Sequence, residues 1–174
     1  MPSLVATWGS TATERALSFP CDRYLPEPDD ALFRAVGIDA PATVLFRWLC
    51  QLKVAPYSYD WIDNFGRTSP RRLIPGLEEL AVGQRFMALF ELVEFEPDRD
   101  LTLRLHGSVF GDVAVTYRII PMGERSTRLV VKLLMRYPIP LRPLAPWIAP
   151  ALDLIMMRKQ LLTLKRLAEG PAET

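Results

Sequence analysis

Alternating apolar and polar residues dominate the second half of the chain. Residues 101–106 alternate strictly between leucine and polar side chains, and 113–119 and 128–136 follow the same period. A period of two places the apolar side chains on one face of a β-strand. Residues 85–95 are predicted to form one further strand, and short polar turns such as 96–100 connect the series. The pattern predicts an antiparallel meander with one apolar and one hydrated face.

A strand and two short helices are predicted ahead of the meander. Residues 31–39 form the predicted first strand, and the apolar residues from 44 to 52 share one face of the helix that follows. Pro41 suits the first turn of that helix. A second short helix is expected to begin near Asp60 and to end at Gly66.

The chain ends in its longest predicted helix, which runs from Pro150 to Glu169 over roughly 30 Å. Its apolar stripe has spacings of three and four and consists of Leu154, Met157, Leu161, Leu164 and Ala168. This helix is the largest apolar element available to cover the meander. Because a twisted sheet curls, a helix across its concave side leaves a cavity. The predicted fold is α+β, a curved antiparallel sheet wrapped around a long C-terminal helix, with two short helices after the first strand.

Length and composition fit one globular domain. The chain has 174 residues, of which 49% are hydrophobic and 24% charged, and its net charge is +1. A chain of this size can bury a core without disulfides or metals. Residues 1–30 contain three prolines between 20 and 28, so we predict an extended lead-in there and a single domain over 31–170. The near-neutral charge excludes a nucleic-acid partner from our expectations.

The cysteines and the hydropathy profile predict a cytoplasmic protein. Cys21 and Cys50 are 29 positions apart, which suits no disulfide framework, and Cys50 is expected to be a buried thiol. The N-terminus lacks the basic start and continuous apolar core of a signal peptide. No segment offers eighteen uncharged apolar residues, so no stable membrane insertion is expected.

The chain offers few groups for catalysis. His106 is the only histidine, and one histidine with two distant cysteines supplies no metal-ligand spacing. No glycine-rich nucleotide motif is present, so we predict no metal, no cofactor and no catalytic residue. Alternation places His106 on the polar face of its strand. Glu91 and Glu94 have opposite parity, so one faces inward in a regular strand, whereas a bulge leaves both in water.

An aromatic-rich turn follows the first predicted helix. Aromatic walls with a few polar groups are typical of small-molecule pockets, although the same residues could instead anchor the turn to the sheet. The inward positions of the strands and of the last helix would complete a pocket, with methionines that adapt to varied apolar ligands. The candidate wall residues are Tyr57, Tyr59, Trp61, Phe65, Phe90, Leu103, Leu105, Val115, Tyr117, Val131, Leu133, Met135, Met157 and Leu161.

Four stretches, in their order along the chain, resemble a known superfamily. These are IDAPATVLFRWL, like a strand–Ala-Pro–helix opening; LAVGQRF before a long strand; EFEPDRDLTLRL, like a central hairpin; and RKQLLTLKRLAE, like a last helix. They resemble the SRPBCC, or START-like, superfamily, whose members have the helix-grip fold and include polyketide cyclases and lipid-transfer domains. WGSTATE and YSYDWIDNFG resemble an uncharacterised bacterial subgroup of it.

The resemblance implies a fold and a cavity for an apolar ligand, but no particular reaction. We expect the protein to bind or carry a small hydrophobic molecule such as a lipid, a polyketide or an aromatic compound. Two alternatives are a polyketide cyclase/dehydratase-like enzyme that uses the same cavity, and a protein-interaction module with a filled cavity. The proline-rich segment 138–150 is compatible with three roles, which are to gate the cavity, to touch a membrane or to form a homodimer contact.

Overall fold

One antiparallel sheet organises the computed structural model, which describes residues 4–58, 68–108 and 111–170. Its strand order is β1-β6-β5-β4-β3-β2. The strands are β1 (Asp30–Ile38), β2 (Arg85–Phe86), β3 (Phe90–Glu96), β4 (Asp100–Ser108), β5 (Gly111–Gly123) and β6 (Ser126–Arg136). The meander therefore pairs neighbours in sequence, and β1 closes the far edge by pairing with β6.

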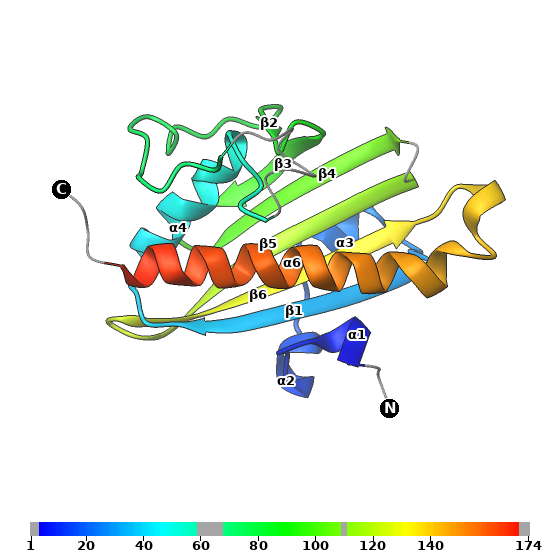
Figure 1. Cartoon of the computed structure of the whole chain (residues 1–174), viewed down its shortest axis with the longest axis horizontal. Coiled ribbons are helices and arrows are strands. Elements are labelled where there is room, and N and C mark those ends of the chain that lie inside the picture. Colours follow the sequence, from blue (N-terminus) through cyan, green and yellow to red (C-terminus); the bar gives the residue numbers. More distant parts are fainter. Residues whose placement is uncertain (1–3, 59–67, 109–110, 171–174) are drawn as a thin grey trace.

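Helices cover both faces of this curved sheet. The long helix α6 (Ala145–Glu169) runs along the concave face, with α4 (Ala42–Cys50) beside it (Figure 1). Three one-turn helices, α1 (Leu4–Thr7), α2 (Ala12–Arg15) and α3 (Cys21–Tyr24), precede β1. Two short 3₁₀ turns, η1 (Gln51–Lys53) and η2 (Ile139–Leu141), follow α4 and β6. This arrangement is the predicted curved sheet around a long C-terminal helix, and it is a helix-grip α+β fold. The second short helix, expected from Asp60 to Gly66, lies outside the described residues.

The apolar positions of the meander lie on one buried face, as the alternation predicts. Leu101, Leu103 and Leu105 are all buried in the core between the sheet, α4 and α6. Met157 and Leu161 meet them from the buried face of α6. Burial of this apolar area, at about 25 cal/mol per Å², is the main stabilising contribution to the grip.

The predicted strand over 85–95 is wrong in one respect, because it is two strands joined by a tight turn. Met87 and Ala88 both have positive φ, 45° and 63°, so the chain reverses between β2 and β3. Such turns usually contain Asn-Gly, and Met-Ala carries no comparable signal. The backbone N–H of Met87 also donates to the carbonyl of Leu52 at 2.9 Å, which ties the turn to η1.

Two further boundaries differ from the prediction. Helix α6 begins at Ala145, five residues before the predicted start, so Pro150 lies inside it. The N-terminal segment is helical in three places rather than extended. At α2 the reason is a capping box in which the Thr11 side chain accepts from the Glu14 N–H and the Glu14 carboxylate accepts from the Thr11 N–H.

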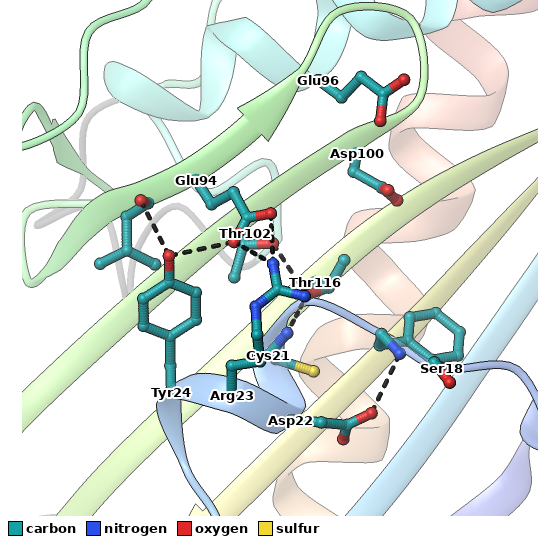
Figure 2. A network of polar contacts seen from close by, with 12 residues as sticks. Ser18, Cys21, Asp22, Arg23, Tyr24, Glu94, Glu96, Asp100, Thr102 and Thr116 are labelled. Atoms are coloured by element: carbon teal, nitrogen blue, oxygen red, sulfur yellow. Dashed lines mark hydrogen bonds and ion pairs between the residues drawn. The ribbon is translucent and has the colours of Figure 1, made fainter.

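The convex face of the sheet is covered by α3 through a chain of polar contacts (Figure 2). The backbone N–H of Cys21 donates to the Thr116 hydroxyl at 3.0 Å, and that hydroxyl lies 2.9 Å from the hydroxyl of Thr102. On the exposed side of α3, Arg23 forms an ion pair with Glu94. Both sheet faces are therefore buried near the centre of β4 and β5.

A second ion pair holds the segment before α3. The Arg118 guanidinium binds both carboxylate oxygens of Asp100, at 2.7 and 2.9 Å, and donates to the carbonyl of Ser18. It also stacks 4.8 Å from the centre of the Phe19 ring. Both charged side chains are nearly buried, with 12% and 5% of their surface exposed.

Removal of this second ion pair is expected to destabilise the fold. Because Arg118→Gln leaves the buried Asp100 carboxylate with only the exposed Arg99, whose Nε lies 3.6 Å away, the free energy of unfolding should fall by about 3 kcal/mol. Urea denaturation measures this change. Arg23→Gln is the matched control, since its ion pair lies in solvent and should contribute little. Equal midpoints for the two variants would contradict the structural role of Arg118.

Candidate functional site

A fully buried arginine lies on the concave face of the sheet, opposite α6. Arg34 has the same parity in β1 as Leu32 and Ile38, which belong to the core. Its side chain is 0% exposed, and its Nη2 donates to the Asp153 carboxylate at 2.7 Å and to the Pro150 carbonyl at 3.4 Å. The guanidinium therefore binds α6 at two points.

The partner carboxylate is almost as deeply buried. Only 8% of the Asp153 side chain is exposed, and this burial raises its pKa to about 6, although the Arg34 guanidinium acts in the opposite direction. Burial likewise lowers the pKa of Arg34, against the opposing effect of Asp153. A carboxyl with a pKa near 6 is ionised at neutral pH and gains a proton in mild acid. The Asp153 carboxyl can therefore exchange a proton near neutral pH.

A second buried polar pair lies farther along α6. The Tyr117 hydroxyl of β5 donates to Oε1 of Gln160 at 2.8 Å, and Nε2 of Gln160 donates to the Pro56 carbonyl at 2.6 Å. Burial is the main cause that raises the pKa of Tyr117, with Asp153 adding to it. Tyr117 therefore stays protonated at physiological pH and can act as a hydrogen-bond donor.

These polar groups are set in an apolar surface that contains the predicted wall residues. Those found in the core are Tyr57, Leu103, Leu105, Val115, Tyr117, Val131, Leu133, Met157 and Leu161, while Phe90 and Met135 pack against it half-buried. Tyr59, Trp61 and Phe65 lie outside the described residues. Tyr57 packs edge-on against Trp48 of α4, with ring centres 6.1 Å apart.

The apolar face is slightly exposed at the end of the grip where β5 begins. Leu105, Val113 and Met135 are neighbours in the register of β4, β5 and β6. The first two retain 8% and 6% exposure and Met135 is half-buried, whereas Leu101 and Leu129, farther along the sheet, retain none. This accessible end lies where β6 leads into η2, beside the first half of α6 (Figure 1).

The residues that the sequence left between two orientations all face away from α6. A bulge between Leu92 and Glu94 brings Glu91 and Glu94 opposite Arg104 and Thr102, on the convex side. The bulge alternative is therefore confirmed, because it places both carboxylates on one face.

His106 also lies on the convex side, as alternation predicts. Its side chain is 71% exposed, and Nδ1 lies 3.0 Å from a carboxylate oxygen of Asp112. It lines a surface depression of about 700 Å³ together with Gly83, Arg85, Ala88, Leu89, Phe90, Glu91, Val93 and Arg104. The depression lies over β2, β3 and β4, on the opposite side of the sheet from the Arg34–Asp153 pair.

Arg34, Asp153 and Gln160 are absent from the residues that the sequence predicts for the site. A signal for them exists. Arg34 occupies an inward position of its strand, and Asp153 and Gln160 share the helical face of Met157. A charged or amide residue in such a position needs a buried hydrogen-bond partner. Strand alternation and helical spacing therefore suffice to identify these residues as unusual.

Both cysteines are buried free thiols, as predicted for Cys50. Burial raises the pKa of Cys21 to about 11 and that of Cys50 to about 12, so neither is a reactive thiolate at neutral pH. Within residues 4–58, 68–108 and 111–170, no group of three or more metal-ligating side chains comes together.

Comparison with known proteins supports the fold. No protein-family model matches the chain, and no curated protein matches it. Among solved structures, a hypothetical protein from Helicobacter pylori is 15% identical with a TM-score of 0.54, and the match covers 88% of this chain and 96% of that one. A protein from Thermobifida fusca is 16% identical with a TM-score of 0.51, over 79% and 94% of the two chains.

A third similar structure is the di-domain ARO/CYC BexL from the BE-7585A biosynthetic pathway. It is 14% identical with a TM-score of 0.55, and the match covers 83% of this chain and 48% of that one. At such identities the likeness is one of fold alone. The comparisons therefore support the helix-grip α+β fold, and the chain carries its own set of buried polar groups.

The buried carboxyl predicts an unusual dependence of stability on pH. The pKa of Asp153 rises from 3.8 in the unfolded chain to about 6 in the folded protein, so folding tightens the hold on this proton. The contribution of Asp153 to the free energy of unfolding is full below about pH 4 and is lost as the pH rises through about 6. The difference in the free energy of unfolding between wild type and Asp153→Asn, measured with urea from pH 4 to 8, isolates the contribution of Asp153.

We expect the stability advantage of wild type over Asp153→Asn to shrink by on the order of 3 kcal/mol between pH 4 and 7. Subtracting the variant removes the contributions of the other carboxyls, such as Glu14 and Glu78, whose pKa values are lowered. An advantage that grows with pH would show that attraction to Arg34 outweighs burial.

Proposed function

We propose that the protein binds a small hydrophobic molecule with a polar end between the concave face of the sheet and α6. The observation that carries this proposal is a buried donor. The Nε–H of Arg34 has no acceptor anywhere in the part of the chain that the structure describes. An unsatisfied buried donor costs about 1 to 3 kcal/mol, and a ligand oxygen at this position would recover that free energy.

The surroundings support an apolar body for such a ligand. Leu105, Val113, Leu133 and Met157 retain slight exposure near the accessible end, and the apolar face continues inward from them. Tyr117 offers a protonated hydroxyl farther along. Burial of apolar surface would supply most of the affinity, and the polar groups would set the orientation.

The resemblance to the SRPBCC superfamily points the same way. Its members include binders and carriers of lipids, polyketides and aromatic compounds, and the fold likeness to BexL is consistent with membership. We favour carriage over catalysis because the one buried carboxylate of this site, Asp153, is paired with Arg34. An acid or base held in an ion pair is less available for proton transfer.

A polyketide cyclase/dehydratase-like enzyme is the second candidate, and the pKa of Asp153 favours it. A carboxyl with a pKa of about 6 is well matched to proton transfer near neutral pH. In this role Asp153 would take a proton from an activated carbon of a bound chain, and Tyr117 would exchange its hydrogen bond to Gln160 for one to a carbonyl oxygen. Carriage returns the ligand unchanged, whereas this reaction does not.

Ligand binding is tested by adding side-chain volume on one face of the sheet at a time. Leu133 faces the concave core and the adjacent Leu134 faces the convex cluster, and both are buried. Leu133→Phe adds volume beside the accessible end, so it should lower the affinity for a lipid or aromatic probe at least about tenfold. Leu134→Phe adds the same volume on the opposite face and should bind the probe like wild type.

Native mass spectrometry of freshly purified protein, followed by a thermal-shift screen of lipids and aromatic compounds, measures these affinities. Denaturation curves confirm that each variant is folded, since overpacking costs about 1 to 3 kcal/mol. Analysis of the released molecule separates the two candidates: an unchanged ligand indicates carriage, and a product that Asp153→Asn fails to form indicates catalysis. Equal binding by both phenylalanine variants would place the ligand elsewhere.

A further inference from the structure

The first half of α6 and the η2 turn before it expose an apolar surface, which we call the 139–155 surface. Seven of the fifteen large apolar side chains that the described residues expose belong to it. They are Ile139, Leu141, Leu144, Trp147, Ile148, Leu152 and Ile155. Trp147 and Ile139 are the most exposed of all, at 82% and 81%. So large a contiguous group on one segment is typical of an interaction site.

Helix α6 is apolar on two opposite sides over this half. Its buried side carries Pro150 and Asp153 and continues into Met157 and Leu161. The residues Leu144, Ile148, Leu152 and Ile155 recur at spacings of three and four on the other side, which places them in one outward stripe. An ordinary helix on a sheet has a polar outer side, so this stripe has no role in the core.

The exposed charges that the segment itself carries are basic. Between residues 136 and 166 the only acidic residue is Asp153, and it is buried against Arg34. The exposed charges are basic, among them Arg142, Arg158 and Lys159. Arg142 lies 3.4 Å from Asp29 at the border of the surface, and the guanidinium of Arg158 lies over the Trp8 ring. The surface therefore joins apolar side chains to cations, and the exposed Asp29 lies at its border beside Arg142.

We propose that the 139–155 surface docks on an anionic lipid bilayer. Apolar side chains with tryptophan and flanking arginine or lysine are the composition of helices that lie in the membrane interface. A two-fold contact between copies would bring the basic residues of one surface onto those of the other, which disfavours a second copy. No helix of the described residues is long and apolar enough to cross a membrane, so the proposed contact is peripheral.

The geometry suits a shallow contact. Figure 1 shows η2 and the start of α6, in yellow to orange, projecting at the end of the molecule away from the C-terminus. With the first half of α6 lying flat in the membrane interface, to a depth of about 5 to 10 Å, the outward stripe would be buried and the sheet would stay in water. The accessible end of the concave face lies beside it, so the docked protein would hold that end close to the lipid.

Vesicle flotation tests the proposal without knowledge of any carried ligand. Wild-type protein should float with phosphatidylcholine vesicles that contain phosphatidylglycerol, and with pure phosphatidylcholine much less. High salt should weaken the interaction because it screens the basic residues. Trp147→Ser should lower the partition coefficient at least about tenfold, since it removes the largest inserted side chain. Arg158→Ser with Lys159→Ser should reduce the preference for the anionic vesicles.

Met122→Ser is the matched control. Met122 is also an exposed apolar residue, at 68%, but it lies at the opposite end of β5 from the 139–155 surface. This variant should bind vesicles like wild type. Loss of binding by Met122→Ser equal to that of Trp147→Ser, or no retention of wild type on anionic vesicles, would overturn the proposal. A dimer in sedimentation velocity that Trp147→Ser dissociates would overturn it in favour of a second copy.

Discussion

The ion pair between Arg34 and Asp153 is the interaction on which the position of the first half of α6 depends. From 145 to 156, only Pro150 and the side chain of Asp153 are buried, and Arg34 binds the Pro150 carbonyl and the Asp153 carboxylate. The second half of the helix is held differently, by burial of Met157, Leu161 and further apolar residues. Apolar burial therefore holds the second half of the helix, and the contacts with Arg34 hold the first half.

This division has consequences for stability and motion. Apolar burial is additive and tolerant of small shifts, whereas a buried ion pair is strongly destabilising when one partner is lost. Loss of either partner would leave a buried polar group without its ion pair, and the half of α6 with little buried surface would be the first to move. The accessible end of the concave face lies under that half, so the ion pair and access to the interior are physically linked.

The fold was predictable because it rests on periodicity. Alternation alone predicts the buried face of Leu101, Leu103 and Leu105. A spacing of three and four residues predicts the inner face of α6. The β2–β3 turn was not predictable, because Met87 and Ala88 adopt left-handed conformations that their side chains do not favour. There the tertiary contact with Leu52 overrides local preference.

The site was predictable only in its apolar part, because an alternation pattern says which face a residue occupies but not which partner it finds. Arg34 and Asp153 are 119 positions apart, and their contact exists only once β1 and α6 have packed.

Docking and ligand binding, as we propose them, would use opposite sides of the same half-helix. A small hydrophobic molecule is poorly soluble in water, so a carrier gains from loading where the molecule already resides. With the outward stripe of α6 in a bilayer, the accessible end of the concave face would open next to lipid rather than to water. The Arg34 guanidinium would then meet the polar end of a molecule whose apolar body follows the face from Leu105 and Met135 inward. The first half of α6 would then contact lipid on its outer side and the bound molecule on its inner side.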